Sequence, residues 1–118
     1  QYGLNCEFHA NPLKAKSVLR QSAFVVSSRY HGMIGALTQD VPCLVMGWSY
    51  KYAGFLEYCP AAQPLLINDV STHSFVSKLD WLLEEGRIPA LRKDLATSNQ
   101  ALAQRSATMW ADIARLSE

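Results

Sequence analysis

The chain has 118 residues, of which 49% are hydrophobic and 18% are charged. This is the composition of a globular domain and argues against a disordered chain. The net charge of +1 argues against a nucleic-acid partner, since such proteins carry a basic surface stripe. No apolar run approaches the roughly 18 residues of a membrane span, so we expect none.

The first residue and the cysteines indicate what kind of protein the chain comes from and in which compartment it folds. It begins with Gln1, and we interpret it as a fragment of a longer protein. Cys6, Cys43 and Cys59 are odd in number and form no CxxC pair, which favours a reducing compartment over a disulfide framework. We expect all three to be small buried hydrophobic residues. No Cys/His set has the spacing of metal ligands, so we expect neither a metal nor a cofactor.

The first predicted element is a helix that begins at Pro12. Asn11 suits the N-cap and Pro12 suits the first helical position. Leu13, Val18 and Leu19 supply a modest apolar face.

Two short apolar runs then read as buried parallel strands. "AFVV" (23–26) ends at the polar pair Ser27-Ser28, and "CLVMG" (43–47) follows Pro42. The remaining elements expected in this part are helices at about 29–38 and 50–58 and a third strand, "PLLI", at 64–67.

Beyond Asp69 the pattern is helical only. One helix starts behind Ser71 or Thr72 and is expected to stop at Gly86. A long helix then opens at Pro89 and carries an apolar stripe. The stripe comprises Leu91, Leu95, Leu102, Met109, Ile113 and Leu116.

Strands that alternate with helices predict an α/β fold with a Rossmann-like parallel sheet flanked by helices. We treat residues 1–118 as one domain. Three strands are few for such a sheet, so we expect it to be completed by preceding chain or by the first eight residues. The long final helix exceeds what three strands can cover, and we expect it to pack on a neighbouring domain.

Three cationic side chains follow the two clearest strands. Arg29 and His31 come after the first strand, and Lys51 comes after the second. Ligands of parallel sheets bind beyond the carboxyl ends of the strands, so these side chains should converge on one crevice. Arg can fork onto a carboxylate or phosphate, Lys supplies a compact charge, and His can bind an anion or transfer a proton. A helix amino terminus near Arg29 also favours an anion. The set suits a small, multiply anionic substrate.

Gly32 and Gly35 lie inside the predicted helix, where each costs about 1 kcal/mol relative to Ala. We expect a close approach of the backbone, either to the sheet or to a ligand, to offset that cost.

The other aromatic, histidine and acidic residues have weaker cases for a functional role. Trp48 and Tyr50 flank it and could line a sugar site. Trp81 and Trp110 are interpreted as packing residues, and His73 as exposed. No role is assigned to His9 or to the acids Asp40, Glu57 and Asp69.

The stretch "SSRYHGMIGALTQDVPCLVMGWSYKYAGFLE" resembles the carboxyl-terminal motif of the polysaccharide pyruvyl transferase family. The shared pattern is Ser-x-Arg-x-His after a strand, a helix of small and apolar residues, a turn with Pro, an apolar strand, and a Lys about twenty residues after the His. Here Ser27-Ser28-Arg29-Tyr30-His31 and Lys51 supply it. Asp40 or Val41 stands where the family has a Gly in the turn.

The resemblance implies half of a two-domain, glycosyltransferase-B-like enzyme. Such enzymes transfer a pyruvyl group from phosphoenolpyruvate to a sugar of a cell-surface or exopolysaccharide, forming a pyruvate ketal. By this resemblance Ser28, Arg29, His31 and Lys51 bind phosphoenolpyruvate, and His31 and Arg29 are catalytic, with His31 binding the phosphate or acting as general acid. Residues 1–118 would be the carboxyl-terminal, donor-binding domain.

The resemblance also implies partners and a location. The acceptor would be a glycan or lipid-linked oligosaccharide, held largely by an amino-terminal domain outside this chain, so the chain alone should be inactive. A cytoplasmic location, including the inner face of the membrane, and a homo-oligomer are both compatible with it. Two alternatives stay open: the donor domain of a sugar-nucleotide glycosyltransferase, for which a Gly-rich loop and a clear ribose-binding acid are lacking, and a non-catalytic binding module.

Overall fold

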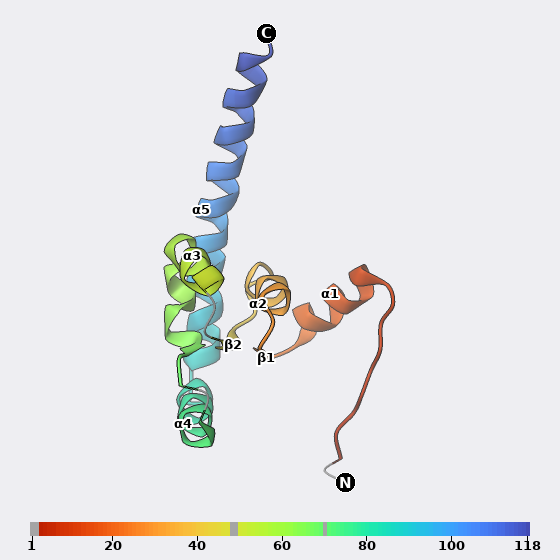
Figure 1. The fold of residues 1–118 in the computed structure, drawn as a ribbon, viewed down its shortest axis with the longest axis vertical. Helices are drawn as coiled ribbons and strands as arrows, with labels where there is room; N and C mark the ends of the chain where they lie inside the picture. The colour runs from red at the N-terminus through yellow and green to blue at the C-terminus, as the bar shows by residue number, and fades with distance from the viewer. Residues whose placement is uncertain (1–2, 48–49, 70) are drawn as a thin grey trace.

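The computed structural model describes residues 3–47, 50–69 and 71–118. Nine elements follow one another along the chain. They are α1 (Pro12–Gln21), β1 (Val25–Ser27), α2 (Tyr30–Leu37), β2 (Cys43–Met46), α3 (Tyr50–Tyr58), the 3-10 helix η1 (Pro60–Leu65), β3 (Leu66–Ile67), α4 (Thr72–Leu82) and α5 (Arg87–Leu116). Figure 1 shows α5 rising out of the body and α1 standing to one side of it.

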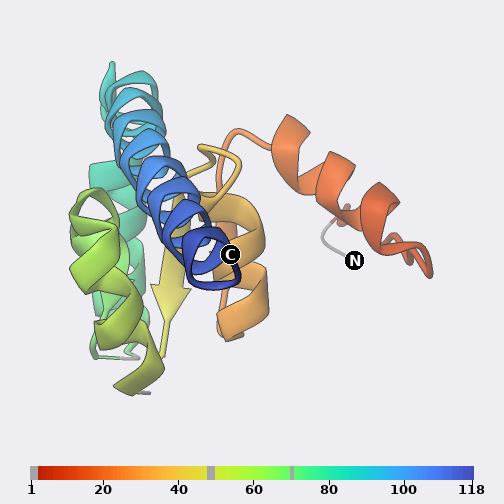
Figure 2. The same ribbon diagram turned by 90° about the horizontal axis from the view of Figure 1, so that it is seen from above.

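The three strands form one parallel sheet in the order β1-β2-β3. Val25 pairs with Cys43, and Met46 pairs with Ile67. Helix α2 packs on β1 and β2, and Figure 2 shows β2 running between α2 and α3. The predicted α/β class, with a small parallel sheet, flanking helices and a long carboxyl-terminal helix, is therefore confirmed.

Local capping explains where α1 and α4 begin. The side chain of Asn11 accepts a hydrogen bond from the backbone N–H of Leu13 at 2.9 Å, and Pro12 occupies the first turn of α1. Ser71 caps α4 in the same way by accepting from the N–H of Ser74 at 3.1 Å. Both predicted helix starts are confirmed.

The core lies between the sheet, α2, α3 and the first half of α5. Its largest fully buried side chains are Met33, Leu37, Leu44, Leu65, Leu82, Leu95, Val41, Val45, Pro42, Cys43 and Cys59. Two of the three cysteines are thus buried as predicted. Cys6 is exposed, which corrects the prediction for the third cysteine, because it lies in the segment before α1, where residues 3–8 are all exposed.

Several predictions need correction. Strand β1 spans 25–27 and not 23–26, and because it lies at the edge of the sheet it is only partly buried, with Val26 42% exposed. Helix α5 begins at Arg87, two residues before the predicted start at Pro89. Pro64 and Leu65 belong to η1, so β3 contains two residues only; Pro64 cannot donate to a sheet ladder. Helix α4 ends at Leu82, and Gly86 instead precedes α5 with a left-handed φ of 76°. Residues 3–10 form neither helix nor strand, so the described part of the amino terminus does not extend the sheet.

Helix α5 is anchored to the body mainly through its first half. Leu91 and Leu95 are buried, Arg92 donates to the carbonyl of Ser22 at 2.6 Å, and Asn99 Nδ2 donates to the carbonyl of Leu37 at 2.8 Å. These contacts join α5 to the carboxyl-terminal ends of α1 and α2.

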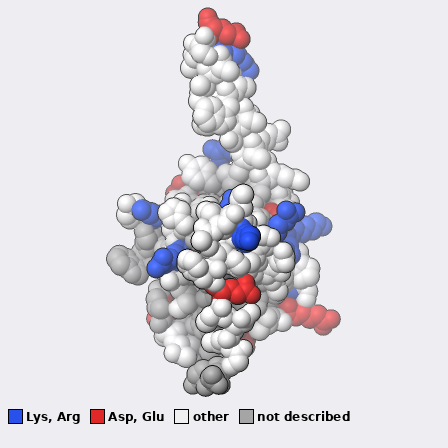
Figure 3. All heavy atoms as spheres, turned by 90° about the vertical axis from the view of Figure 1, so that its right-hand side faces the viewer, with Lys and Arg blue, Asp and Glu red and all other residues white. Residues whose placement is uncertain are grey.

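The second half of α5 leaves the body. Met109, Trp110 and Leu116 are 50%, 62% and 88% exposed, so the interpretation of Trp110 as a packing residue is wrong for this chain. On the face shown in Figure 3, this projecting part is largely uncharged until charged side chains gather near its tip. None of the helices described is both long and apolar enough to cross a membrane.

Candidate functional site

The loop after β1 is shaped by Ser27. Its hydroxyl accepts a hydrogen bond from the N–H of Arg29 at 3.1 Å and donates to the carbonyl of Arg29 at 3.0 Å. Arg29 therefore sits as the extended residue before the first turn of α2, with φ −108°. This arrangement places His31 in that first turn, beyond the carboxyl end of β1.

The loops after β1 and β2 are joined by a buried tyrosine. Tyr52 is 5% exposed, and its hydroxyl donates to the carbonyl of Ser28 at 2.8 Å. Its ring lies against Gly47, where a Cβ would overlap the ring. Tyr52 was missed at the level of sequence, because nothing in the tyrosine-rich run 50–58 distinguishes the buried ring from the exposed ones.

A groove of about 480 Å³ lies between the first turn of α2 and the length of α3, and we call it the α2–α3 groove. The described residues that line it are Tyr30, His31, Lys51, Gly54, Phe55, Glu57 and Tyr58. The structure therefore brings His31 and Lys51 together from the ends of two adjacent strands.

The other two predicted site residues lie beside the groove. Ser28 and Arg29 are exposed in the loop that leads into it, and neither is among its lining residues. Tyr30 connects this loop with the groove: its ring meets that of His31 edge-on at 5.9 Å and that of Tyr52 at 6.0 Å between centroids.

Packing accounts for both helical glycines. A Cβ on Gly32 would overlap the hydroxyl of Ser27 and lie 3.3 Å from its Cβ, and one on Gly35 would lie 3.2 Å from Leu19 Cδ1. Gly32 thus permits α2 to approach the end of β1, and Gly35 permits it to approach α1. Of the two reasons expected for these glycines, close backbone packing is the one observed.

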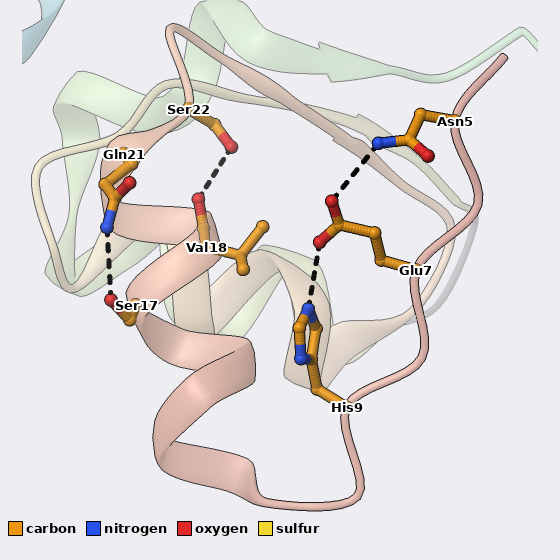
Figure 4. Close-up of polar contacts among 7 residues, drawn as sticks. All are labelled: Asn5, Glu7, His9, Ser17, Val18, Gln21 and Ser22. Carbon is orange, nitrogen blue, oxygen red and sulfur yellow. Dashed lines mark hydrogen bonds and ion pairs between the residues drawn. The ribbon is translucent and has the colours of Figure 1, made fainter.

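The remaining histidines lie away from the α2–α3 groove. His9 Nε2 is 3.0 Å from Glu7 Oε2, in the segment before α1 (Figure 4). His73 is exposed, as predicted, and lines a separate groove of about 440 Å³ next to β3. Asp69 lines that second groove too, and its carboxylate accepts from the hydroxyl of Ser74 at 3.0 Å.

Of the two aromatic residues predicted for a sugar site, one is described by the structure. Tyr50 is 82% exposed and does not line the α2–α3 groove, while Trp48 falls outside the described residues. Of the three acids left without a role, only Glu57 lines the α2–α3 groove. Asp40 instead accepts a hydrogen bond from Asn99 at 2.6 Å.

The buried thiols are not candidates for nucleophilic chemistry. Burial raises the pKa of the Cys43 thiol to about 12 and also raises the pKa of Cys59. Within residues 3–47, 50–69 and 71–118, no three His, Cys, Asp or Glu side chains are grouped so that they could hold a metal ion.

Comparison with known proteins gives a match to one family model over part of the chain. Residues 8–50 match the family model described as polysaccharide pyruvyl transferase, which confirms the resemblance over this segment. The match includes Ser28, Arg29 and His31, and Lys51 is the residue after its end. No curated protein and no solved structure gives a significant match to the chain.

Proposed function

We propose that this chain is the donor-binding part of a polysaccharide pyruvyl transferase and that it binds phosphoenolpyruvate. The observation that supports this is the α2–α3 groove, in which His31 and Lys51 lie together at the ends of β1 and β2. His31 falls within the segment that matches the transferase family, and Lys51 directly follows it.

The chemistry of the donor fits these side chains. Phosphoenolpyruvate carries a phosphate and a carboxylate on three carbons, so it needs two cationic contacts a short distance apart. Lys51 offers a compact charge for the phosphate, and the long, exposed side chain of Arg29 offers a fork for the carboxylate. As two acceptor hydroxyls form bonds to C2 of the donor and the bond from C2 to the phosphate oxygen breaks, one hydroxyl proton is taken up by the methylene carbon and the other by the leaving phosphate. His31 binds that phosphate or delivers its proton as general acid.

The same proposal includes an acceptor molecule and a second domain that helps to bind it. The glycosyltransferase-B-like arrangement places the donor between two domains, with the present α/β unit as one half. A glycan or lipid-linked oligosaccharide receives the pyruvyl group as a ketal. We therefore expect no turnover from this chain alone, and turnover by the isolated chain would show that expectation wrong.

Calorimetric titration with phosphoenolpyruvate tests the donor site. We expect the chain to bind it, and Arg29→Ala and Lys51→Ala each to weaken binding by roughly 10- to 100-fold, because a charge-assisted hydrogen bond contributes about 1.5–3 kcal/mol. Lys93→Ala is the matched control, since Lys93 is exposed on α5 away from the groove. It should bind as the unmodified chain does.

Other outcomes of the titration would contradict the proposal. Equal weakening by the Lys93 variant would point to non-specific attraction of an anion. Binding of a uridine-diphosphate sugar in place of phosphoenolpyruvate would favour a sugar-nucleotide glycosyltransferase.

A further inference from the structure

We infer that the aromatic wall of the α2–α3 groove binds a pyranose ring of the acceptor glycan and that Glu57 accepts hydrogen bonds from its hydroxyls. The inference rests on the proposed function, which it deepens by giving the acceptor sugar a contact surface on this domain. The family resemblance implies only that the acceptor is held largely by another domain.

Three aromatic side chains form the wall. Tyr30 and Phe55 are partly buried against the core, and Tyr58 is 51% exposed; all three line the groove. A small anion such as phosphoenolpyruvate has little apolar surface to place against such a wall. A pyranose ring does, because its C–H groups present an apolar face that gains from burial on an aromatic ring.

The wall is held in place by its neighbours. The guanidinium carbon of Arg105 lies 5.3 Å from the ring centroid of Tyr58, so α5 supports that ring. The ring of Tyr30 is packed against those of His31 and Tyr52. A preformed surface binds a rigid ligand at a lower entropic cost than one that must be ordered on binding.

The carboxylate of Glu57 in the groove is not explained by an anionic ligand, because it carries the same sign of charge as that ligand. Glu57 lines the groove together with His31 and Lys51, and an ionised carboxylate repels phosphate and carboxylate ligands. Its two oxygens are acceptors only, so it is suited to neighbouring hydroxyls of one sugar ring. Group transfer requires the donor and the acceptor to be held side by side. A groove with cationic groups for the donor and a carboxylate for the acceptor hydroxyls meets that requirement.

The groove also has space for a second ligand. Its volume of about 480 Å³ lies within the roughly 300–1,000 Å³ of small-molecule sites, which is more than a three-carbon donor occupies. Gly54 lines it, and a Cβ at Gly54 would meet no atom within 4 Å. A larger side chain at this position would therefore fill the groove without disturbing the packing of α3.

Saturation-transfer NMR on this chain tests the inference, with methyl β-D-galactopyranoside and methyl β-D-glucopyranoside as probes at millimolar concentration. We expect ring-proton signals for at least one probe, reduced several-fold by Glu57→Gln, Tyr58→Ala and Gly54→Leu. Tyr50→Ala is the matched control, since Tyr50 is an exposed tyrosine of the same helix outside the groove. Circular dichroism of each variant confirms that it is folded.

Titration of the same variants with phosphoenolpyruvate separates the two proposals. We expect Glu57→Gln to leave donor binding intact or to strengthen it, because a negative charge is removed from beside the donor. Donor binding with no signal from either probe, or with equal loss in Tyr50→Ala, would overturn the sugar site and leave the proposed function standing. A sugar signal that depends on Glu57 and Tyr58, without donor binding, would support the sugar site and contradict pyruvyl transfer.

Discussion

At the scale of single residues, Gly32 decides whether the loop after β1 can form. Replacement by Ala should raise helix propensity by about 1 kcal/mol, yet the new methyl would overlap the Ser27 hydroxyl. Turning that hydroxyl away breaks its two hydrogen bonds with Arg29, each worth roughly 1 kcal/mol. We expect Gly32→Ala to lower the free energy of unfolding by about 1 kcal/mol net, measured by urea denaturation.

Gly54→Ala is the control for Gly32→Ala. Its methyl group meets open space, so it should stabilise the chain by up to about 1 kcal/mol. If Gly32→Ala were as stabilising as Gly54→Ala, the contact between α2 and Ser27 would not constrain the loop.

The cysteines should differ in reactivity by position. Cys6 is exposed, whereas Cys43 is buried with its pKa raised from 9.0 to about 12. A thiol with a raised pKa stays protonated in the folded state and ionises on unfolding, so stability present below pH 9 is lost as the pH rises from 9 towards 12. We expect a thiol reagent at pH 8 to label one cysteine in the folded chain and three in denaturant. Rapid labelling of Cys43 without denaturant would contradict its burial.

At the scale of elements, Asn99 connects α5 to the end of α2. Its amide donates to the carbonyl of Leu37 at 2.8 Å and to Asp40 Oδ1 at 2.6 Å. Asp40 has a left-handed φ of 62°, so the contact also holds a strained turn in place. We expect Asn99→Ala to destabilise the chain by about 1–3 kcal/mol, measured by thermal or urea unfolding. The adjacent exposed Gln100 provides the control, because Gln100→Ala should change the stability little.

Some elements could be predicted from the sequence and others could not. The start of α1 was predictable because Asn11 and Pro12 are adjacent local signals, and the parallel strands were predictable from two continuous apolar runs. The extent of β3 was not predictable, because tertiary packing around η1 decides that Pro64 belongs to the 3-10 helix and not to the strand. In the site, the strand ends brought His31 and Lys51 together as expected. The aromatic wall was not foreseen, because the rotation of α3 about its axis, which selects Tyr58 over Tyr50, is set by tertiary contacts.

At the scale of the whole molecule, the projecting half of α5 sets the dimensions. The chain measures 61 × 30 × 28 Å with a radius of gyration of 16.3 Å, against about 13.5 Å for a compact chain of this length. Residues 106–118 are all exposed. We expect their deletion to bring the radius of gyration from small-angle scattering towards the compact value while leaving the unfolding midpoint nearly unchanged. A large fall in the midpoint would show that this segment stabilises the body.

The described residues of the α2–α3 groove all fall between Tyr30 and Tyr58. Two consecutive strand–helix units therefore supply its lining, with strand partners fewer than twenty residues apart. Such short separations mean low contact order, and little loop-closure entropy is lost in bringing the lining residues together. The anchoring of α5 joins residues some 60–70 positions apart and carries a larger closure cost. Folding should thus assemble the groove first and add its support from α5 afterwards.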